Sequence, residues 1–514
     1  MFESSWPETP DPDGRSPASR CLSVLGTASD VGKSVVTTAL CRIFRDLGYR
    51  TAPFKAQNMS NNAGVTPDGG EIGRAQIVQA EAAGAVPDPD MNPVLLKPNT
   101  DTGSQVVLHG RAIGNREAGE YFGDTSVFRR EALASLQRLR NRYDMVVMEG
   151  AGSCAEINLR DRDFVNFDMA HAADCPVLLV ADIDRGGVFA QVVGTLEVIP
   201  QLDRARVAGI LINRFRGDIE LFRDGIRYLE GRTRLPVLGV IPWFHHIEID
   251  PEDALPVPIV RGGKRPLNPA NINVAVIRLP HISNFTDFSP LQREPEVDLR
   301  YPVKPIPLDG YDLVLLPGSK NSRFDLDWLR RSGWEAHLRE YVSNDGRLAG
   351  LCGGYQMLGQ TISDPTGVEG VPGTSAGLGY LPIHTTLDRD KLVRRASGTW
   401  LATGDAVRGY EIHVGRTEID PGTQPLIEWH RTDEASPQYD GAFSEEGRVW
   451  GCYLHGLFDE PALLERVLGD IRPGFQVKTR HAGLKFRERQ YGLLADHFRE
   501  HMDLTRLFHL VGHA

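Results

Sequence analysis

The chain has 514 residues, of which 41% are hydrophobic, and this length predicts two to four domains with separate buried cores. Its formal net charge of -11 argues against nucleic acid or a membrane surface as the main partner, because both attract basic patches. The six cysteines are scattered without a C-x-x-C pair, which argues against a zinc ribbon or a disulfide framework and fits a reducing cytoplasm. We therefore expect small-molecule ligands, and the sequence leaves the oligomeric state open.

Composition divides the chain into segments. Residues 1–20 are rich in Pro, Ser, Asp and Glu and lack an apolar core, so they are expected to be a disordered tail rather than a signal peptide or a membrane anchor. A second loop-like stretch, rich in proline, follows the first α/β region and predicts a linker at 251–271. The expected order is a domain at 21–250, the linker, a domain at 272–470 and a helical extension at 471–514.

Short apolar runs alternate with amphipathic stretches in both domains, which is typical of a parallel sheet covered by helices on both faces. In the first domain the predicted strands are 21–25, 144–148, 177–180, 207–212 and 237–241. In the second domain they are 272–277, 313–316, 347–351 and 449–454. Apolar residues at helical spacing, ended by Gly48, predict a helix over 33–47.

A glycine-rich loop joins the first predicted strand to this helix. It runs from Gly26 to Gly32-Lys33-Ser34, so that backbone N–H groups and a helix N-terminus face one point. Such loops bind phosphates, with the lysine balancing phosphate charge and the hydroxyl holding Mg²⁺. An ordinary strand-to-helix turn is the alternative. Five residues separate the two glycines, one more than in the usual Walker A loop, and this spacing resembles the dethiobiotin synthetase type of ATP site.

Five further residues are candidates for this ATP site. Glu149 ends a predicted strand and precedes Gly150-Ala151-Gly152, so it is the expected Mg²⁺ ligand at the ligand-binding edge of the sheet. Asn213 follows another strand and is a candidate for reading the base, with Pro242-Trp243 flanking the ring. Lys55 is a candidate contact for transferred phosphate or an acidic substrate, although an isolated lysine is more often a solvated surface charge.

In the second domain, Cys352 stands between an apolar strand and a predicted helix, in Gly350-Leu351-Cys352-Gly353-Gly354. This pattern predicts a nucleophile elbow, in which glycines permit a tight turn and the helix N-terminus favours the thiolate. His455 ends the strand 449–454 and is the predicted base. Backbone N–H groups at Gly318 and Gly353 are the predicted oxyanion hole.

This set of residues resembles the class I glutamine amidotransferases, in which a cysteine attacks the glutamine side-chain amide and ammonia is released. In most of these enzymes a glutamate follows the histidine by two residues, but Leu457 stands there in this chain. Glu411 is therefore a candidate for orienting His455 or for contacting substrate. The resemblance implies an α/β fold, with a P-loop parallel-sheet domain of the dethiobiotin synthetase-like type followed by a flavodoxin-like amidotransferase domain.

An ATP site and an ammonia source in one chain predict ATP-dependent amidation of a carboxylate. The segments 182–190 (DIDRGGVFA) and 55–62 (KAQNMSNN) resemble the cobyric acid synthase family of cobalamin biosynthesis. The resemblance implies amidation of the b, d, e and g carboxylates of adenosylcobyrinic acid a,c-diamide, with one glutamine and one ATP used for each. The expected cofactors are ATP and Mg²⁺. The alternatives are a cobyrinic acid a,c-diamide synthase, another glutamine-dependent amide ligase, or a P-loop scaffold ATPase with a vestigial second domain.

Overall fold

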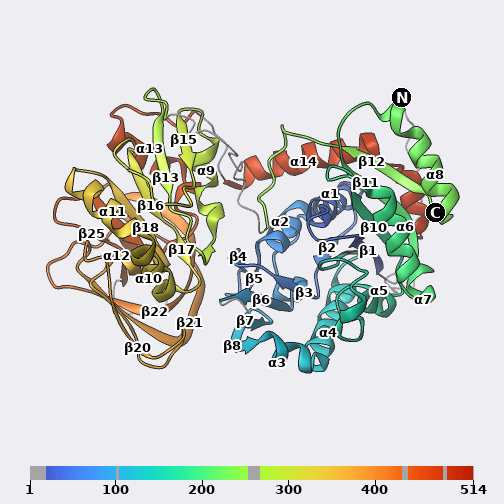
Figure 1. The fold of residues 1–514 in the computed structure, drawn as a ribbon, viewed down its shortest axis with the longest axis horizontal. Coiled ribbons are helices and arrows are strands. Elements are labelled where there is room, and N and C mark those ends of the chain that lie inside the picture. Colours follow the sequence, from blue (N-terminus) through green and yellow to red (C-terminus); the bar gives the residue numbers. More distant parts are fainter. Residues whose placement is uncertain (1–18, 100–102, 253–266, 431–437, 479–482, 513–514) are drawn as a thin grey trace.

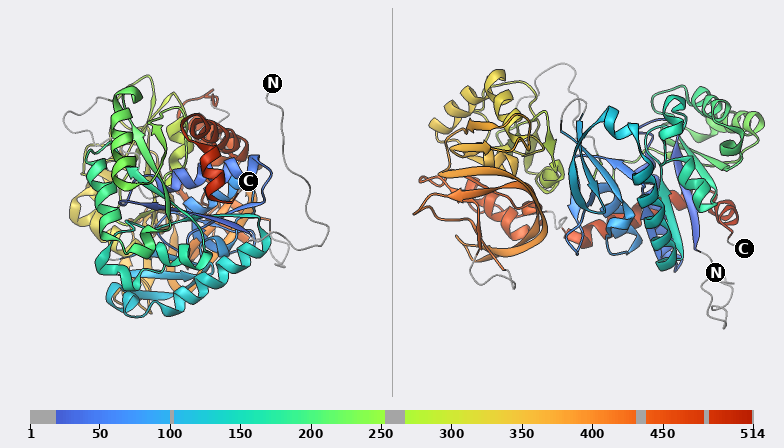
Figure 2. Two further views of the ribbon diagram at one scale, coloured as in Figure 1. Left: turned by 90° about the vertical axis from the view of Figure 1, so that its right-hand side faces the viewer. Right: turned by 90° about the horizontal axis from the view of Figure 1, so that it is seen from below.

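The computed structural model describes residues 19–99, 103–252, 267–430, 438–478 and 483–512. Residues 1–18 of the expected tail and 253–266 of the expected linker lie outside this described part. Figure 1 shows two bodies side by side, with the N-terminal half of the chain in blue and green and the second half mainly in yellow and orange. The right-hand view of Figure 2, in which the molecule is seen from below, shows that the two bodies together form an elongated molecule.

The first body is built on a six-stranded parallel sheet. Its strands, in spatial order, are β12 (Val237–Pro242), β11 (Val207–Phe215), β10 (Val177–Asp182), β1 (Arg20–Gly26), β9 (Met145–Glu149) and β2 (Thr51–Phe54). Five of them overlap the predicted strands. Such strands are buried on both faces, which explains why they read as continuous apolar runs.

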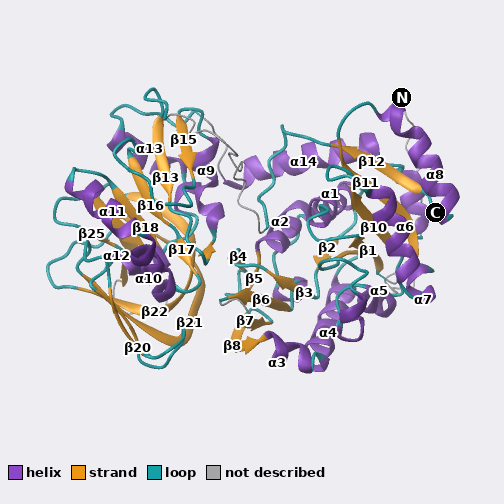
Figure 3. Cartoon of the chain, viewed as in Figure 1, coloured by secondary structure: helices purple, strands orange, loops and turns teal. Residues whose placement is uncertain are grey.

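Helices cover both faces of this sheet (Figure 3). On one face lies α1 (Lys33–Asp46), which confirms the predicted helix to within one residue at its end. The other face packs against α4 (Ser126–Arg142), α5 (Phe167–Ala173), α6 (Val188–Val198) and α8 (Arg223–Thr233). Further helices of this body are α2 (Arg74–Ala83), α3 (Ala118–Gly123), α7 (Gln201–Arg204) and the 3₁₀ turns at Pro89–Met91, Ile157–Arg162 and Ile219–Phe222.

Two small sheets extend the first body toward the second. One has the order β3 (Gln57–Met59), β6 (Val94–Pro98), β7 (Gly103–Leu108) and β8 (Arg111–Glu117). The other pairs β4 (Ala63–Val65) with β5 (Glu71–Gly73). Ala63 and Val65 share an apolar cluster with Ile412 of the second body, so this extension forms part of the interface between the bodies.

The second body has a six-stranded sheet that includes all four predicted strands. Its order is β15 (Val297–Arg300), β13 (Ile272–Val276), β16 (Leu313–Leu316), β18 (Leu348–Leu351), β26 (Val449–Cys452) and β25 (Ala442–Phe443), with only β25 antiparallel. Its helices are α9 (Ser289–Arg293), α10 (Ser322–Ser332), α11 (Trp334–Ser343), α12 (Gly353–Leu358), α13 (Pro461–Ile471) and the 3₁₀ turns η4 (Phe285–Phe288) and η5 (Leu457–Asp459).

A second sheet in this body was not predicted. It is centred on a long antiparallel hairpin, β21 (Ile383–Trp400) and β22 (Asp405–Ile419). The smaller strands around it are β19 (Thr361–Asp364), β20 (Gly373–Ala376), β23 (Ile427–Trp429) and β24 (Gln438–Asp440), and β14 (Ile282–Ser283) pairs separately with β17 (Gly318–Ser319).

The C-terminal segment returns to the first body. Helix α14 (Gly483–His501) lies beside α1 and β12 and is followed by α15 (Leu504–Leu510), both drawn in red in Figure 1. Glu488 of α14 pairs with Arg42 and Arg45 of α1 at 2.8 and 2.9 Å. Among the described residues, no helix combines the length and the apolar character needed to span a bilayer.

The packing of α14 predicts a contrast between two neighbouring leucines. Leu494 is fully buried in the cluster shared with α1, whereas Leu493 is 39% exposed. We expect Leu494→Ala to lower the free energy of unfolding by about 2–5 kcal/mol, as truncation of buried leucines generally does. Leu493→Ala should change it by about 0.5 kcal/mol or less. Scanning calorimetry of both variants measures this, and equal midpoints would show that α14 adds little to the first core.

Candidate functional site

The glycine-rich loop has the expected strand-loop-helix geometry. Gly32 has φ +94° and lies so close to Asn213 that a Cβ there would be 2.2 Å from its Nδ2 atom, so glycine is required. Lys33 Nζ donates to the carbonyls of Ala28 (3.1 Å) and Gly152 (2.6 Å). Burial lowers the pKa of Lys33, and the nearby Glu149 opposes this shift. The structure thus brings the loop, the lysine and the segment after β9 together.

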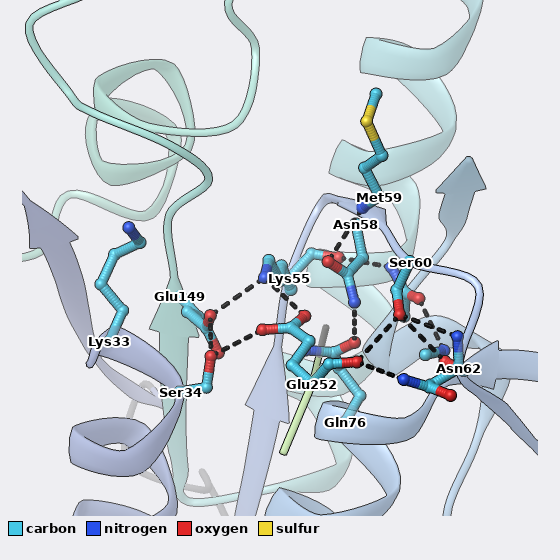
Figure 4. A network of polar contacts seen from close by, with 12 residues as sticks. Lys33, Ser34, Lys55, Asn58, Met59, Ser60, Asn62, Gln76, Glu149 and Glu252 are labelled. Carbon is cyan, nitrogen blue, oxygen red and sulfur yellow. Dashed lines mark hydrogen bonds and ion pairs between the residues drawn. The ribbon is translucent and has the colours of Figure 1, made fainter. Parts of the chain in front are cut away.

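A buried polar network lies at the start of α1 (Figure 4). Ser34 Oγ is 2.8 Å from both Glu149 Oε1 and Glu252 Oε2, and Lys55 Nζ donates to the same two carboxylates at 3.0 and 3.1 Å. Gln79 Nε2 donates to the other oxygen of Glu149 at 2.5 Å. Three of the sequence candidates therefore meet here, and Lys55 is a buried ion-pair partner rather than a solvated surface charge.

Glu252 is a member of this network that the sequence did not predict. Its carboxylate is held by Ser34 and Lys55, although 218 residues separate it from Ser34 along the chain. Burial alone would lower the pKa of Lys55, but Glu149 and Glu252 outweigh burial and raise it. Burial alone would raise the pKa of Glu252, but Lys55 and Ser34 outweigh burial and lower it. Charged forms of both partners are therefore favoured.

The oxygen atoms of this network fit a Mg²⁺ ion. Mg²⁺ prefers carboxylate and hydroxyl oxygens, and Ser34, Glu149 and Glu252 present such atoms at one point. The Ser34 hydroxyl has a single proton but two carboxylate oxygens at 2.8 Å, so it can donate to only one of them at a time. A bound cation would attract both the Ser34 oxygen and the carboxylate oxygen to which Ser34 does not donate, and so remove the repulsion between these two atoms.

Asn213 braces the loop in this structure. Its Nδ2 atom donates to the carbonyl of Val31 at 2.9 Å. Trp243 lies close by, with the guanidinium of Arg216 3.9 Å from its ring centre and its backbone N–H donating to Phe215. Contact of Asn213 or Trp243 with a nucleotide base stays a prediction.

The predicted nucleophile elbow at Cys352 has a strained backbone. Cys352 has φ +51° and ψ −109°, between the end of β18 and the start of α12. A non-glycine residue in this region of backbone space costs free energy and is held only by its surroundings. A Cβ at Gly354 would lie 2.1 Å from the carbonyl oxygen of Leu316, so glycine is needed for this close approach. The buried thiol faces the carbonyl of Ile412, with Sγ 3.5 Å from the oxygen.

The predicted oxyanion turn lies against the elbow. A Cβ at Gly353 would be 2.7 Å from the backbone nitrogen of Ser319, and one at Gly318 would be 3.4 Å from the His455 ring. The two segments are therefore in close contact, and Gly318 lies beside the imidazole. Their role as an oxyanion hole, through Gly318 and Gly353, stays a prediction.

The His455 ring is paired with Asp287 and not with Glu411, which was one candidate for this position. His455 Nδ1 lies 2.7 Å from Asp287 Oδ2, and the backbone N–H of Gly456 donates to the other oxygen at 2.9 Å. Glu411 instead pairs with Arg394 at 2.5 Å and lies 3.7 Å from His413. Asp287 is 168 residues from His455 in sequence, and no spacing signal distinguishes it from other aspartates.

The environment of His455 favours its protonated form. Burial alone would lower the pKa of His455, but Asp287 and Cys352 outweigh burial and raise it to about 10. The Nε2 atom is buried and has no hydrogen-bond partner among the described residues. An imidazolium whose Nε2–H lies on the side of the Cys352 thiol suits proton delivery to a leaving group.

A small cavity is lined by the thiol, and a larger cavity shares two of its lining residues but does not reach Cys352. The smaller, about 30 Å³, is lined by Cys352 together with Lys320, Lys391 and His413. The larger, about 370 Å³, shares Lys391 and His413 and also contains Glu411. Charged groups of both signs therefore line these two cavities, and contact of Glu411 with substrate stays a prediction.

Comparison with known proteins gives one family match for each of the two bodies. Residues 22–257 match the family described as the CobQ/CobB/MinD/ParA nucleotide binding domain, and residues 273–463 match the CobB/CobQ-like glutamine amidotransferase domain. The cobyric acid synthase of Chlorobium phaeobacteroides strain BS1 is 54% identical over 96% of this chain and 99% of its own length. The chain belongs to the cobyric acid synthase family.

Other members of the family are similar over nearly the same length. The cobyric acid synthase of Chlorobaculum tepidum is 54% identical over 96% of this chain and 98% of its own length. The cobyric acid synthase of Klebsiella pneumoniae strain 342 is 47% identical over 95% of this chain and 97% of its own length. The resemblance inferred from residues 55–62 and 182–190 is therefore confirmed, as is the α/β fold with a P-loop domain followed by an amidotransferase domain.

The Asp287–His455 pair predicts the effect of a neutral substitution. Asp287→Asn should reduce glutamine hydrolysis roughly 10²- to 10⁴-fold, because the imidazole loses its orienting charge. Since Asp287 raises the pKa of His455, its loss should also move the alkaline limb of the rate profile to lower pH. Glutamate release measured against pH tests both effects. Glu411→Gln is the matched control, and an equal shift of its alkaline limb would contradict the assignment of Asp287.

Proposed function

We propose that the chain catalyses the cobyric acid synthase reaction, the ATP- and glutamine-dependent amidation of the b, d, e and g carboxylates of adenosylcobyrinic acid a,c-diamide. The observation that supports this proposal is the presence of two sites in one chain: a Cys352–His455–Asp287 set and a phosphate loop with Glu149 beside it. Its proposed partners are small molecules, namely glutamine, ATP and the corrinoid, and its proposed location is the cytoplasm.

The glutaminase half supplies ammonia. His455 takes up the proton of the Cys352 thiol, and the resulting thiolate Sγ attacks the side-chain carbonyl carbon of glutamine while the Gly318 and Gly353 segments stabilise the oxyanion. The carbon–nitrogen bond then breaks, His455 delivers a proton to the leaving nitrogen, and ammonia departs from a γ-glutamyl thioester. Water hydrolyses the thioester to glutamate and restores the thiol. Asp287 keeps the His455 ring in place throughout.

The synthetase half activates the acceptor. A carboxylate oxygen of the corrinoid attacks the γ-phosphorus of ATP, ADP leaves, and an acyl phosphate forms. Ammonia then attacks the acyl carbon and phosphate departs, giving the amide. Lys33 and the loop N–H groups balance phosphate charge, and Lys55 is a proposed contact for the transferred phosphate or the acidic substrate. Ser34, Glu149 and Glu252 would hold Mg²⁺, which neutralises phosphate charge when bound.

Two alternatives differ in testable ways. A cobyrinic acid a,c-diamide synthase would carry out the same chemistry on a less amidated corrinoid, so supplying each corrinoid separately and weighing the product by mass spectrometry distinguishes the two. The names of the relatives at 47–54% identity favour the cobyric acid synthase reaction. A scaffold ATPase with a vestigial second domain would form no amide with either corrinoid.

Separate sites predict separable activities. Cys352→Ala cannot form the thioester, yet the phosphate loop is unaltered, so this variant should form no amide with glutamine and the normal product with a high ammonium concentration. Product mass and ATP consumption are the measurements. Full glutamine-dependent activity in Cys352→Ala would refute the nucleophile assignment. Loss of the ammonium-dependent reaction in the folded variant would refute the separation of the sites.

Lys33 predicts the complementary phenotype. Lys33→Ala removes the cation that balances phosphate charge, so amidation should fall at least 10²-fold with either nitrogen source, as expected for a lost electrostatic contact in the transition state. Glutamine hydrolysis measured without corrinoid should change far less. Normal amidation by this variant would exclude the loop as the ATP site.

A further inference from the structure

The two bodies meet close to His455 through a pair of asparagines. Asn62 Oδ1 accepts a hydrogen bond from the backbone N–H of Phe285 at 3.2 Å. In return, Asn284 Oδ1 accepts one from the backbone N–H of Ala63 at 3.1 Å. Both asparagine side chains are buried, with each residue 3% exposed. The first body therefore holds the backbone turn at 284–285 by two reciprocal contacts.

This turn carries the acid that orients the catalytic histidine. Asn284 has φ +50°, and its carbonyl accepts the N–H of Asp287 at 3.0 Å, which closes the turn. Asparagine tolerates this left-handed conformation better than most residues. Asp287 thus stands one short turn from the clasped backbone, and its carboxylate reaches His455 Nδ1. A displacement of the turn would move that carboxylate.

The orientation of the Asn62 amide is itself fixed. Its Nδ2 atom donates to the backbone carbonyl of Glu252 at 2.7 Å, and its own N–H donates to Ser60 Oγ at 3.0 Å (Figure 4). With Nδ2 anchored in this way, Oδ1 is directed to Phe285. A side chain needs both a donor and an acceptor to make these contacts, so neither alanine nor a carboxylate can replace it.

We propose that Asn62 of the nucleotide-binding body is a positioning residue of the glutaminase site: it holds the turn at 284–287 so that Asp287 meets His455. The inference rests on the proposed function and goes beyond it. The glutaminase base is then assembled only when both bodies are docked. Because the residue acts through Asp287, its loss should resemble a weak form of the Asp287 substitution.

The experiment compares full-length Asn62→Ala with Asn115→Ala. Asn115 also makes a hydrogen bond across the interface, to the carbonyl of Val368 at 3.4 Å, but does not touch the turn. Asn62→Ala should lower kcat for glutamine hydrolysis about 10-fold or more with little change in KM. The alkaline limb of its pH–rate profile should move to lower pH. Ammonium-dependent amidation should fall by a smaller factor than glutamine hydrolysis does, since Asn62 also donates to the backbone carbonyl of Glu252. Asn115→Ala should match wild type.

A double substitution tests the route of the effect. Asn62→Ala combined with Asp287→Asn should hydrolyse glutamine no more slowly than Asp287→Asn alone, because the two residues act in series. Asn284→Gly provides an independent variant, since it removes the Oδ1 acceptor while glycine keeps the left-handed backbone. It should reproduce the Asn62→Ala phenotype.

The outcomes separate this inference from the proposed function. Additive losses in the double variant, or equal losses of the glutamine- and ammonium-dependent reactions, would overturn the positioning role. Wild-type glutamine hydrolysis by both Asn62→Ala and Asn284→Gly would overturn it as well. If Cys352→Ala hydrolysed glutamine normally, the proposed function would fail instead.

Discussion

The turn from a parallel strand into a helix determines where Lys33 and Cys352 lie. Lys33 begins α1 directly after the loop that follows β1, and Cys352 stands between β18 and α12. At each turn, free N–H groups at the helix N-terminus face the ligand side, where they stabilise negative charge. The partners come from neighbouring strand ends, since Glu149 closes β9 and His455 follows β26. The sheet edge therefore assembles each site from distant sequence.

The same geometry explains what the sequence could predict. Strands buried on both faces read as apolar runs, and the tight turns after β1 and β18 need glycine, so the central strands, Lys33 and Cys352 were identifiable. The hairpin of β21 and β22 was not, because its residues are largely half-exposed and include the charged run from Asp388 to Lys391. Asp287 and Glu252 were missed because tertiary folding alone brings them to His455 and Ser34.

Charges buried between the bodies favour one fixed arrangement of the two. Glu71 of the first body is fully buried and pairs with Lys97 and with Lys391 of the second body. Burial alone would raise the pKa of Glu71, but the two lysines outweigh it and hold the pKa well below its usual range. Separating the bodies would leave these groups without their partners, and breaking a buried ion pair is strongly unfavourable. Lys320 adds a further contact across the interface, donating to Gln105 at 2.9 Å.

The surroundings of Leu457, two residues after His455, explain why the acid that contacts His455 does not lie at that position. Leu457 is fully buried in an apolar cluster that includes Phe288 and Phe458, so a carboxylate there would be desolvated without a compensating charge. Asp287 instead approaches the imidazole from η4, where the N–H of Gly456 also donates to it. An acid two residues after His455 would contact it from the same strand end. Asp287 contacts it from a turn that is itself held by a hydrogen bond across the interface. The orientation of His455 thereby comes under the influence of Asn62 and of the body that binds the nucleotide.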